Sequence, residues 1–171
     1  MNLPGPLNPS PRLLLGPGPS DAHPRVLRAM STPLVGHLDP QFLEIMNAVQ
    51  TMLRAVYQTK NPVTFPVSAT GMAGMETCFV NLIEPGDSVV VCVAGFFGQR
   101  MVEIAGRAGA KVTVLERPWG EVFDLNPLRE VLQKVCPKVL AIVQAETSTG
   151  AWQPLEQLGE LCHEFDTLLL V

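Results

Sequence analysis

Residues 88–93 read SVVVCV, an apolar run with no polar side chain between its valines, and residues 168–171 read LLLV. A strand that is apolar on both faces is typical of the centre of a parallel sheet covered by helices on each side. Outward from these two runs, short apolar segments alternate with amphipathic stretches of helical length, the pattern of βα units. The sequence therefore predicts an α/β fold with a mainly parallel sheet.

This pattern predicts five strands and four helices after Asn61-Pro62. The strands are expected at residues 63–68, 88–93, 111–115, 139–144 and 167–171. The helices are expected at residues 72–83, 98–108, 127–135 and 155–165. We interpret residues 61–171 as the first part of a larger α/β domain, because a central strand at the end of the sequence lacks the loop that follows it. A complete small domain is the competing interpretation.

The N-terminal part of the chain has a different composition. Seven of the 16 prolines lie within the first 24 residues, and proline restricts both itself and its predecessor to extended conformations. We therefore expect an extended arm over residues 1–20, with Ser20 or Asp21 capping a helix after it. A second helix is predicted after Asp39, with Pro40 in its first position. Residues 21–60 thus form a predicted helical segment.

Composition excludes several classes of function. The chain of 171 residues carries 12 Lys+Arg against 16 Asp+Glu, a net charge of −4, which disfavours binding to nucleic acid or to an anionic membrane surface. Its apolar runs are shorter than the roughly 20 residues that a membrane helix needs. The N-terminus lacks the pattern of a secretory signal, so we expect a cytoplasmic protein. The four cysteines have no metal-ligand spacing, and no metal site is expected.

Three polar or glycine-containing segments follow predicted strands: residues 68–72 (SATGM), 95–100 (GFFGQR) and 146–150 (ETSTG). The first places small residues at a helix start, where unpaired N–H groups favour a phosphate, although a simple helix cap looks the same. The second offers an aromatic side chain that could stack on a planar ring or belong to the core. The third offers hydroxyl groups, or merely a polar turn. Their shared position at one sheet edge favours one ligand for all three.

Other common sites find no support. No GxGxxG motif follows a strand and no GxxxxGK[ST] motif occurs, which argues against a dinucleotide-dependent oxidoreductase or a P-loop enzyme. No arrangement of Ser, His and Asp indicates a hydrolase. His37 lies in a loop before the long helix, where it could face a site or only solvent.

Six motifs in order carry a family resemblance: residues 13–20 (LLLGPGPS), 68–72, 81–87 (NLIEPGD), 95–100, 146–150 and 158–163 (LGELCH). Together they resemble the class V pyridoxal-phosphate aminotransferases, and in particular the serine–pyruvate/alanine–glyoxylate aminotransferase group. The resemblance covers nearly the whole chain from about Arg12. It implies the fold type I large domain, pyridoxal 5′-phosphate as cofactor, and a homodimer.

The resemblance also assigns cofactor-binding residues. Thr70 and Gly71 would form the phosphate cup, Phe97 would stack on the pyridine ring, and Thr147 would bond the phenolic oxygen of the ring. Two positions depart from the pattern of relatives. Phe97 stands where tryptophan is frequent, and Met72, beside the ring, stands where some relatives have histidine.

The resemblance implies further parts of the site. Gly36 and His37 would line the substrate entrance. An aspartate that pairs with the pyridinium nitrogen, the Schiff-base lysine and the small C-terminal domain would all follow Val171, so no catalytic residue is expected within these residues. A chain ending there is expected to be inactive on its own.

The implied activity of the intact protein is transfer of the amino group of a small amino acid, alanine or serine, to the 2-oxo acid glyoxylate or pyruvate. Two alternatives stay open. One is another class V reaction, as in cysteine desulfurases or phosphoserine aminotransferases. The other is a non-catalytic interaction or regulatory fragment that dimerises through the arm and the helix at residues 39–57.

Overall fold

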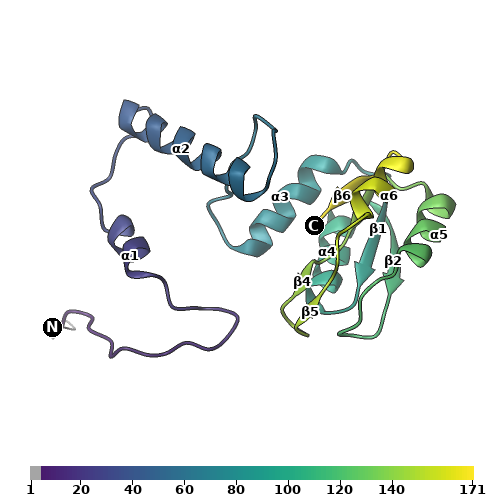
Figure 1. The fold of residues 1–171 in the computed structure, drawn as a ribbon, viewed down its shortest axis with the longest axis horizontal. Coiled ribbons are helices and arrows are strands. Elements are labelled where there is room, and N and C mark those ends of the chain that lie inside the picture. Colours follow the sequence, from purple (N-terminus) through teal and green to yellow (C-terminus); the bar gives the residue numbers. More distant parts are fainter. Residues whose placement is uncertain (1–4) are drawn as a thin grey trace. The chain divides into compact units, whose positions relative to one another are not determined.

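The computed structural model describes residues 5–171, so the first four residues of the predicted arm lie outside the described part. The chain divides between Phe65 and Pro66 into two compact units (Figure 1). The sequence places the change of organisation at residues 60–61, close to this division. No helix within residues 5–171 is long and apolar enough to cross a membrane.

The first unit contains two helices, α1 (Pro24–Met30) and α2 (Pro40–Val56). Helix α2 begins as predicted, because Pro40 occupies its first turn and the carboxylate of Asp39 accepts a hydrogen bond from the backbone N–H of Gln41 at 2.8 Å. Before α1, residues 5–23 form no helix or strand. Most side chains of this unit are exposed, including apolar ones.

The start of α1 corrects the predicted cap. Neither Ser20 nor Asp21 caps this helix; His23 does, and its Nδ1 accepts a hydrogen bond from the N–H of Arg25 at 3.2 Å. Asp21 instead accepts a hydrogen bond from the N–H of Leu14 at 3.1 Å. Pro24 explains the later start, because proline suits the first position of a helix, where its missing N–H is not needed.

The second unit is the α/β part of the chain. Its elements in order are α3 (Gly71–Leu82), β1 (Ser88–Val93), α4 (Phe96–Arg107), β2 (Lys111–Glu116), α5 (Leu125–Val135), β3 (Val139–Ala141), β4 (Ala145–Glu146), β5 (Ala151–Trp152), α6 (Leu158–Glu164) and β6 (Leu168–Leu170). Four strands form a parallel sheet in the order β2-β1-β3-β6, with β1 and β3 in the centre. This confirms the α/β fold and four of the five predicted strands.

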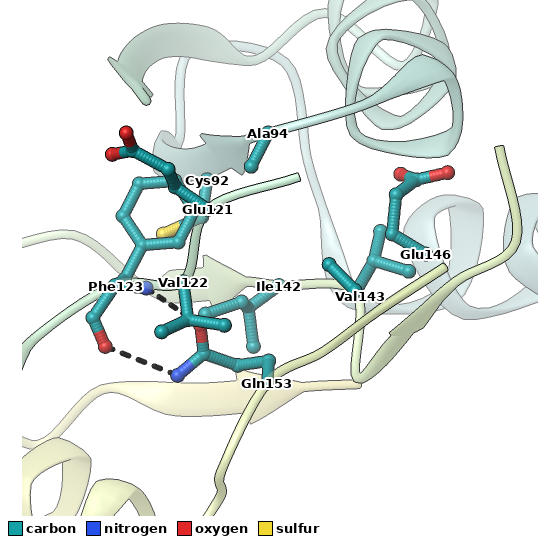
Figure 2. A pocket seen from close by; sticks show the side chains of 10 residues that line it. Cys92, Ala94, Glu121, Val122, Phe123, Ile142, Val143, Glu146 and Gln153 are labelled. Carbon is teal, nitrogen blue, oxygen red and sulfur yellow. Dashed lines mark hydrogen bonds between the residues drawn. The ribbon is translucent and has the colours of Figure 1, made fainter. Parts of the chain in front are cut away.

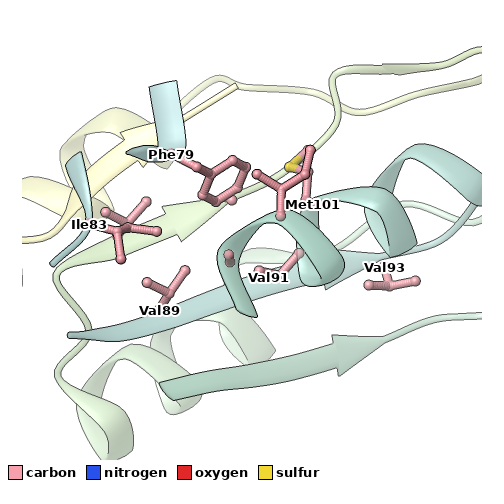
Figure 3. Packing of buried hydrophobic residues seen from close by; sticks show 10 residues of the cluster. Phe79, Ile83, Val89, Val91, Val93 and Met101 are labelled. Carbon is pink, nitrogen blue, oxygen red and sulfur yellow. The ribbon is translucent and has the colours of Figure 1, made fainter. Parts of the chain in front are cut away.

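The core lies on both faces of this sheet, as the apolar runs predict. On one face, Val89, Val91 and Val93 of β1 pack with Phe79 of α3 and Met101 of α4 (Figure 3). On the other face, the alternate β1 residues Val90 and Cys92 pack with side chains of α5 and α6, among them Leu128, Leu132, Leu158 and Leu161. The period of two along β1 therefore divides its side chains between two helical layers.

One predicted strand is absent and one predicted helix begins later than expected. Residues 63–68 form no strand, because their side chains are mostly exposed and Pro66 has no N–H to give to a neighbouring strand. The helix predicted at residues 155–165 begins only at Leu158, since Gln157 before it adopts a left-handed backbone conformation with φ of 68°.

The strand predicted at residues 139–144 ends early, at Ala141, where the chain leaves the parallel sheet. It then forms a short antiparallel hairpin, β4 and β5, that the sequence did not predict. The N–H of Gln153 donates to the carbonyl of Gln144 at 2.7 Å and extends this pairing. The hairpin projects the turn at residues 147–150 from the end of the sheet.

Candidate active site

The three candidate segments follow the topology to one edge of the sheet. Helix α3 joins the beginning of β1 through the turn at residues 84–87, so its own first residues lie toward the carboxyl end of the strands. Helix α4 begins directly after β1, and the β4–β5 hairpin follows β3. The carboxyl edge of an open α/β sheet is where its ligands bind.

The start of α3 is open. Thr70 caps it with a long hydrogen bond, in which its Oγ1 accepts from the N–H of Ala73 at 3.4 Å. Thr70 is also exposed. The N–H groups of Gly71 and Met72 have no acceptor among the residues that the structure describes. A Cβ built on Gly71 would meet no atom within 4 Å. Free N–H groups, the positive end of the helix dipole and open space fit a phosphate group.

The start of α4 is closed by a buried carboxylate. Glu146, the last residue of β4, is only 4% exposed. Its Oε2 accepts hydrogen bonds from the backbone N–H groups of Phe97 at 3.1 Å and Gly98 at 3.2 Å. These are N–H groups of the first helical turn, which have no partner inside the helix. The carboxylate therefore takes the position at α4 that an external anion would occupy.

Ser148 completes this network from the turn of the hairpin. Its hydroxyl donates to Oε1 of Glu146 at 2.6 Å and accepts from the N–H of Phe96 at 3.0 Å. Its own N–H donates to Oε1 of Glu146 at 3.3 Å. The predicted segments at residues 95–100 and 146–150 are thus joined by direct hydrogen bonds. The sequence indicates the hydroxyl groups of residues 147–149 as possible ligand contacts but does not reveal the role of Glu146.

Two glycines make this contact possible. A Cβ on Gly95 would collide with the side chain of Glu146. A Cβ on Gly98 would lie 2.9 Å from the carbonyl oxygen of Cys92 and 2.9 Å from the Cα of Val93. The glycine spacing around the two phenylalanines is therefore the sequence feature that could have revealed a close approach here.

The aromatic pair of α4 is not part of the core. Phe96 is 47% exposed, and Phe97 is partly buried and meets Phe96 edge to face, with 5.4 Å between ring centroids. Thr147 lies in the turn after Glu146 and is exposed. Both predicted ring contacts, Phe97 and Thr147, are thus next to the Glu146 network, and their roles toward a cofactor stay predictions.

A small pocket lies behind this network (Figure 2). It is lined by Cys92, Ala94, Glu146 and Gln153, among others. The side-chain amide of Gln153 accepts from the N–H of Phe123 at 2.7 Å and donates to its carbonyl at 3.1 Å, as the dashed lines show. This pair of bonds fastens the loop after β2 to β5.

The chemistry of this pocket is passive. Burial, together with a smaller effect of the neighbouring Cys162, raises the pKa of the Cys92 thiol to about 12. A thiol with so high a pKa is not a nucleophile at neutral pH. Across residues 5–171, no group of three or more His, Cys, Asp and Glu is placed to hold a metal ion.

The predicted entrance residues belong to the other unit. Gly36 and His37 are exposed, and the carbonyl of Gly36 accepts a hydrogen bond from the N–H of Asp39 at 3.0 Å. They form the loop that leads into α2. Their place at a substrate entrance stays a prediction.

Comparisons with known proteins place this arrangement in a family. The aminotransferase class-V family matches residues 13–171. The chain is 46% identical to (S)-ureidoglycine–glyoxylate transaminase of Bacillus subtilis over 94% of its own length, and 45% identical to alanine–glyoxylate aminotransferase of Mus musculus over 97%. It spans 38% and 40%, respectively, of those relatives.

Solved structures give the same result. The crystal structure of alanine–glyoxylate aminotransferase from Nostoc sp. matches with a TM-score of 0.94 and 58% identity, covering 96% of this chain and 44% of that one. Ureidoglycine–glyoxylate aminotransferase from Bacillus subtilis matches with a TM-score of 0.93 and 45% identity, covering 95% and 42%. The sheet and its helices are therefore part of a fold type I large domain. The chain belongs to the class-V aminotransferase family, whose cofactor is pyridoxal 5′-phosphate.

Proposed function

We propose that the intact protein transfers the amino group of a small amino acid, alanine or serine, to glyoxylate or pyruvate. The names of its relatives support glyoxylate as the acceptor, because both the alanine and the ureidoglycine enzymes use it by name. The chain spans about two fifths of these relatives, at 38% and 40%. In this proposal, residues 66–171 supply the phosphate end and one ring face of the cofactor site.

The observation that carries the proposal is the open start of α3. Gly71 and Met72 present N–H groups with no acceptor among residues 5–171, and the hydroxyl of Thr70 stands beside them. These groups would hold the phosphate of the cofactor by hydrogen bonds and by the helix dipole. Once bound, pyridoxal phosphate supplies an electron sink for bonds at the α-carbon of the amino acid.

The other residues of the chain would orient the ring. Phe97 would cover one ring face, and aromatic stacking would hold the ring at a fixed tilt. The hydroxyl of Thr147 would bond the phenolic oxygen of the ring, which fixes its rotation. The lysine and the carboxylate that complete the chemistry are expected beyond Val171, as the family resemblance implies.

Assembly and location belong to the same proposal. We expect a cytoplasmic homodimer with active sites at the subunit interface, and Gly36 and His37 lining the entrance. The many exposed apolar side chains of the first unit, such as Leu15, Leu34 and Met52, support a partner surface. Light scattering of the protein at its natural length is expected to give twice the mass of one chain, whereas a monomer would contradict the dimer.

The test of the activity uses the protein at its natural length, loaded with pyridoxal phosphate. L-Alanine with glyoxylate is expected to give pyruvate and glycine, measured by coupled oxidation of a reduced nicotinamide dinucleotide. Absence of glycine and of the matching 2-oxo acid, pyruvate from alanine or hydroxypyruvate from serine, would contradict the proposal. A protein that ends at Val171 is expected to show no turnover under the same conditions.

Ureidoglycine is a second candidate donor. It is supported by the 46% identity to the Bacillus subtilis transaminase, which lies between the 45% identity to the alanine enzyme of Mus musculus and the 58% identity to that of Nostoc sp.. Comparing kcat/KM for alanine, serine and (S)-ureidoglycine at saturating glyoxylate decides between them. A higher value for ureidoglycine would replace alanine as the donor and leave the rest of the proposal in place.

A further inference from the structure

We propose that Glu146 is a positioning residue for the cofactor ring: its buried carboxylate holds the first turn of α4 and thereby keeps Phe97 where the ring stacks. This inference rests on the proposed function and deepens it. Glu146 need not touch the cofactor in this role, because it acts through the backbone of Phe97.

The carboxylate of Glu146 contacts the backbone of Phe97. It bonds the backbone N–H of Phe97, at 3.1 Å to Oε2 and 3.3 Å to Oε1, and not the aromatic ring itself. A side chain on a fixed backbone has only a few staggered positions, so fixing the N–H also fixes where the ring of Phe97 can lie. The ring stays free to contact a ligand, as its partial exposure allows.

The hydrogen-bond network of Glu146 and Ser148 joins two segments that are distant in sequence. Phe97 follows β1, whereas Glu146 and Thr147 follow β3. Each of the two proposed ring contacts therefore lies directly beside the same network: Phe97 donates to it, and Thr147 lies between Glu146 and Ser148. One buried carboxylate thus sets the spacing between the group over the ring face and the group at the phenolic oxygen.

The hydrogen bonds of Glu146 at the start of α4 stabilise this part of the fold. A carboxylate that accepts hydrogen bonds at a helix N-terminus makes charge-assisted bonds and interacts favourably with the dipole. Burial strengthens these bonds, and no buried polar side-chain atom of the described chain lacks a partner. Loops at a sheet edge are otherwise among the least stable parts of a fold. The network therefore gives the site a rigid wall where a loop would be mobile.

The test uses Phe97→Trp as a reporter in the protein at its natural length, with and without Glu146→Gln. The probe is 4′-deoxypyridoxine 5′-phosphate, which lacks the aldehyde and binds without a covalent bond. Contact between the probe and the indole at position 97 quenches its fluorescence. The signal of Trp119 and Trp152 is subtracted with the parent protein that retains Phe97. Circular dichroism and a thermal melt establish that each variant folds.

We expect the probe to quench the reporter strongly and Glu146→Gln to reduce the quenching at saturation, with about tenfold weaker binding. Glutamine keeps the size of the side chain but brings an NH₂ group toward N–H donors. Asp124→Asn is the matched control, because Asp124 is a carboxylate at the start of α5 that makes no capping hydrogen bond there. It removes the same charge and is expected to leave both values unchanged.

Each outcome of the fluorescence experiment supports or contradicts the role of Glu146. Equal quenching at saturation with and without Glu146→Gln would overturn the inference and leave the proposed function standing. A probe that binds by equilibrium dialysis without quenching the reporter would contradict ring stacking at position 97 and therefore this inference, whereas transamination itself is decided by the activity assay. If Glu146→Gln does not fold, Ser148→Ala answers the same question, since it removes only the hydroxyl that links Glu146 to Phe96.

Discussion

Helices α3 and α4 begin at the same edge of the sheet, yet their first turns are in opposite states. At α4, Glu146 and Ser148 accept the N–H groups of Phe96, Phe97 and Gly98. At α3, the only side-chain acceptor within the described chain is Thr70, at 3.4 Å. Both helices have a dipole that attracts an anion. The difference teaches that a helix start becomes a ligand site only where the protein leaves its N–H groups free.

The same contrast extends along the two helices. Helix α4 buries Gly98, Met101, Ile104 and Ala105, whereas α3 buries only Phe79. A helix with few buried contacts opens locally at lower free energy than one packed along its length. We therefore expect α4 to be the rigid support of the site and α3 the more adaptable one.

The largest expected effect concerns cysteine reactivity. Cys78 of α3 is exposed, whereas Cys92 of β1, on the sheet face covered by α5 and α6, is 2% exposed and its pKa is raised from 9.0 to about 12, mainly by burial. At neutral pH this lowers the thiolate fraction of Cys92 about a thousandfold. A thiol-specific reagent followed by peptide mass spectrometry is expected to modify Cys78 far faster. Equal rates would contradict the burial of β1 between its two helical layers.

The raised pKa of Cys92 also predicts an alkaline limit. The folded state holds the proton more tightly than the unfolded state, so this stabilisation is complete below pH 9.0 and is lost as the pH rises towards about 12. Cys92→Ala is expected to weaken this part of the alkaline loss of stability. Urea unfolding curves at increasing pH measure it.

The next effect is steric, at the two helical glycines. Gly98→Ala is expected to destabilise the fold by about 2 to 3 kcal/mol, because its Cβ would press on the backbone of β1 and overpacking costs that much. Chemical denaturation gives the free energy of unfolding. A loss below about 0.5 kcal/mol, the range of ordinary surface changes, would show that α4 can move away from the strand.

Gly74→Ala is the matched control in α3. A Cβ at Gly74 would meet no atom within 4 Å. Since alanine favours the helix over glycine, the expected result is a gain of about 0.5 to 1 kcal/mol. The same substitution therefore has opposite signs in the two helices.

A smaller effect is expected at the closed helix start. Ser148→Ala removes a hydroxyl that bonds both Glu146 and Phe96, and it should cost about 1 kcal/mol of stability. Thr149→Ala, one residue further along the turn, removes a hydroxyl with bonds only inside the turn and is expected to cost less. A reversed order would indicate that the network contributes little.

The smallest stability effect is expected at the open helix start. Thr70→Ala should cost only about 0.5 kcal/mol, at the low end for a helix cap, because the hydrogen bond of Thr70 is long and exposed. Affinity for the phosphate of the cofactor should fall more than stability does. Thr70→Ser is the control, and equal affinity of the alanine variant would place the phosphate elsewhere.

Much of the fold was predictable because it depends on local patterns. The strand at residues 88–93 and the helix after Asp39 were recognisable from consecutive apolar residues and from a cap followed by proline. The start of α3 at Thr70 was equally predictable, since a hydroxyl residue and a glycine precede an apolar helix. These features need only neighbouring residues to form.

The features that were not predictable depend on distant residues. The β4–β5 hairpin is too short for a pattern of its own, and residues 63–68 resemble a strand but have no neighbour to pair with. Nothing in the residues around Glu146 indicates that its partner is the turn at Phe97. Only the pairing of β1 with β3 brings the two together.

The absence of a side chain at Gly95 also has a consequence for how this sequence can evolve. The carboxylate of Glu146 occupies space that any Cβ at position 95 would take. A lineage that acquired alanine at position 95 would have to shorten or lose the glutamate, and a lineage that lost the glutamate would no longer need the glycine. We therefore expect positions 95 and 146 to be inherited as a pair, and their joint replacement in a related sequence would mark a cofactor pocket built in another way.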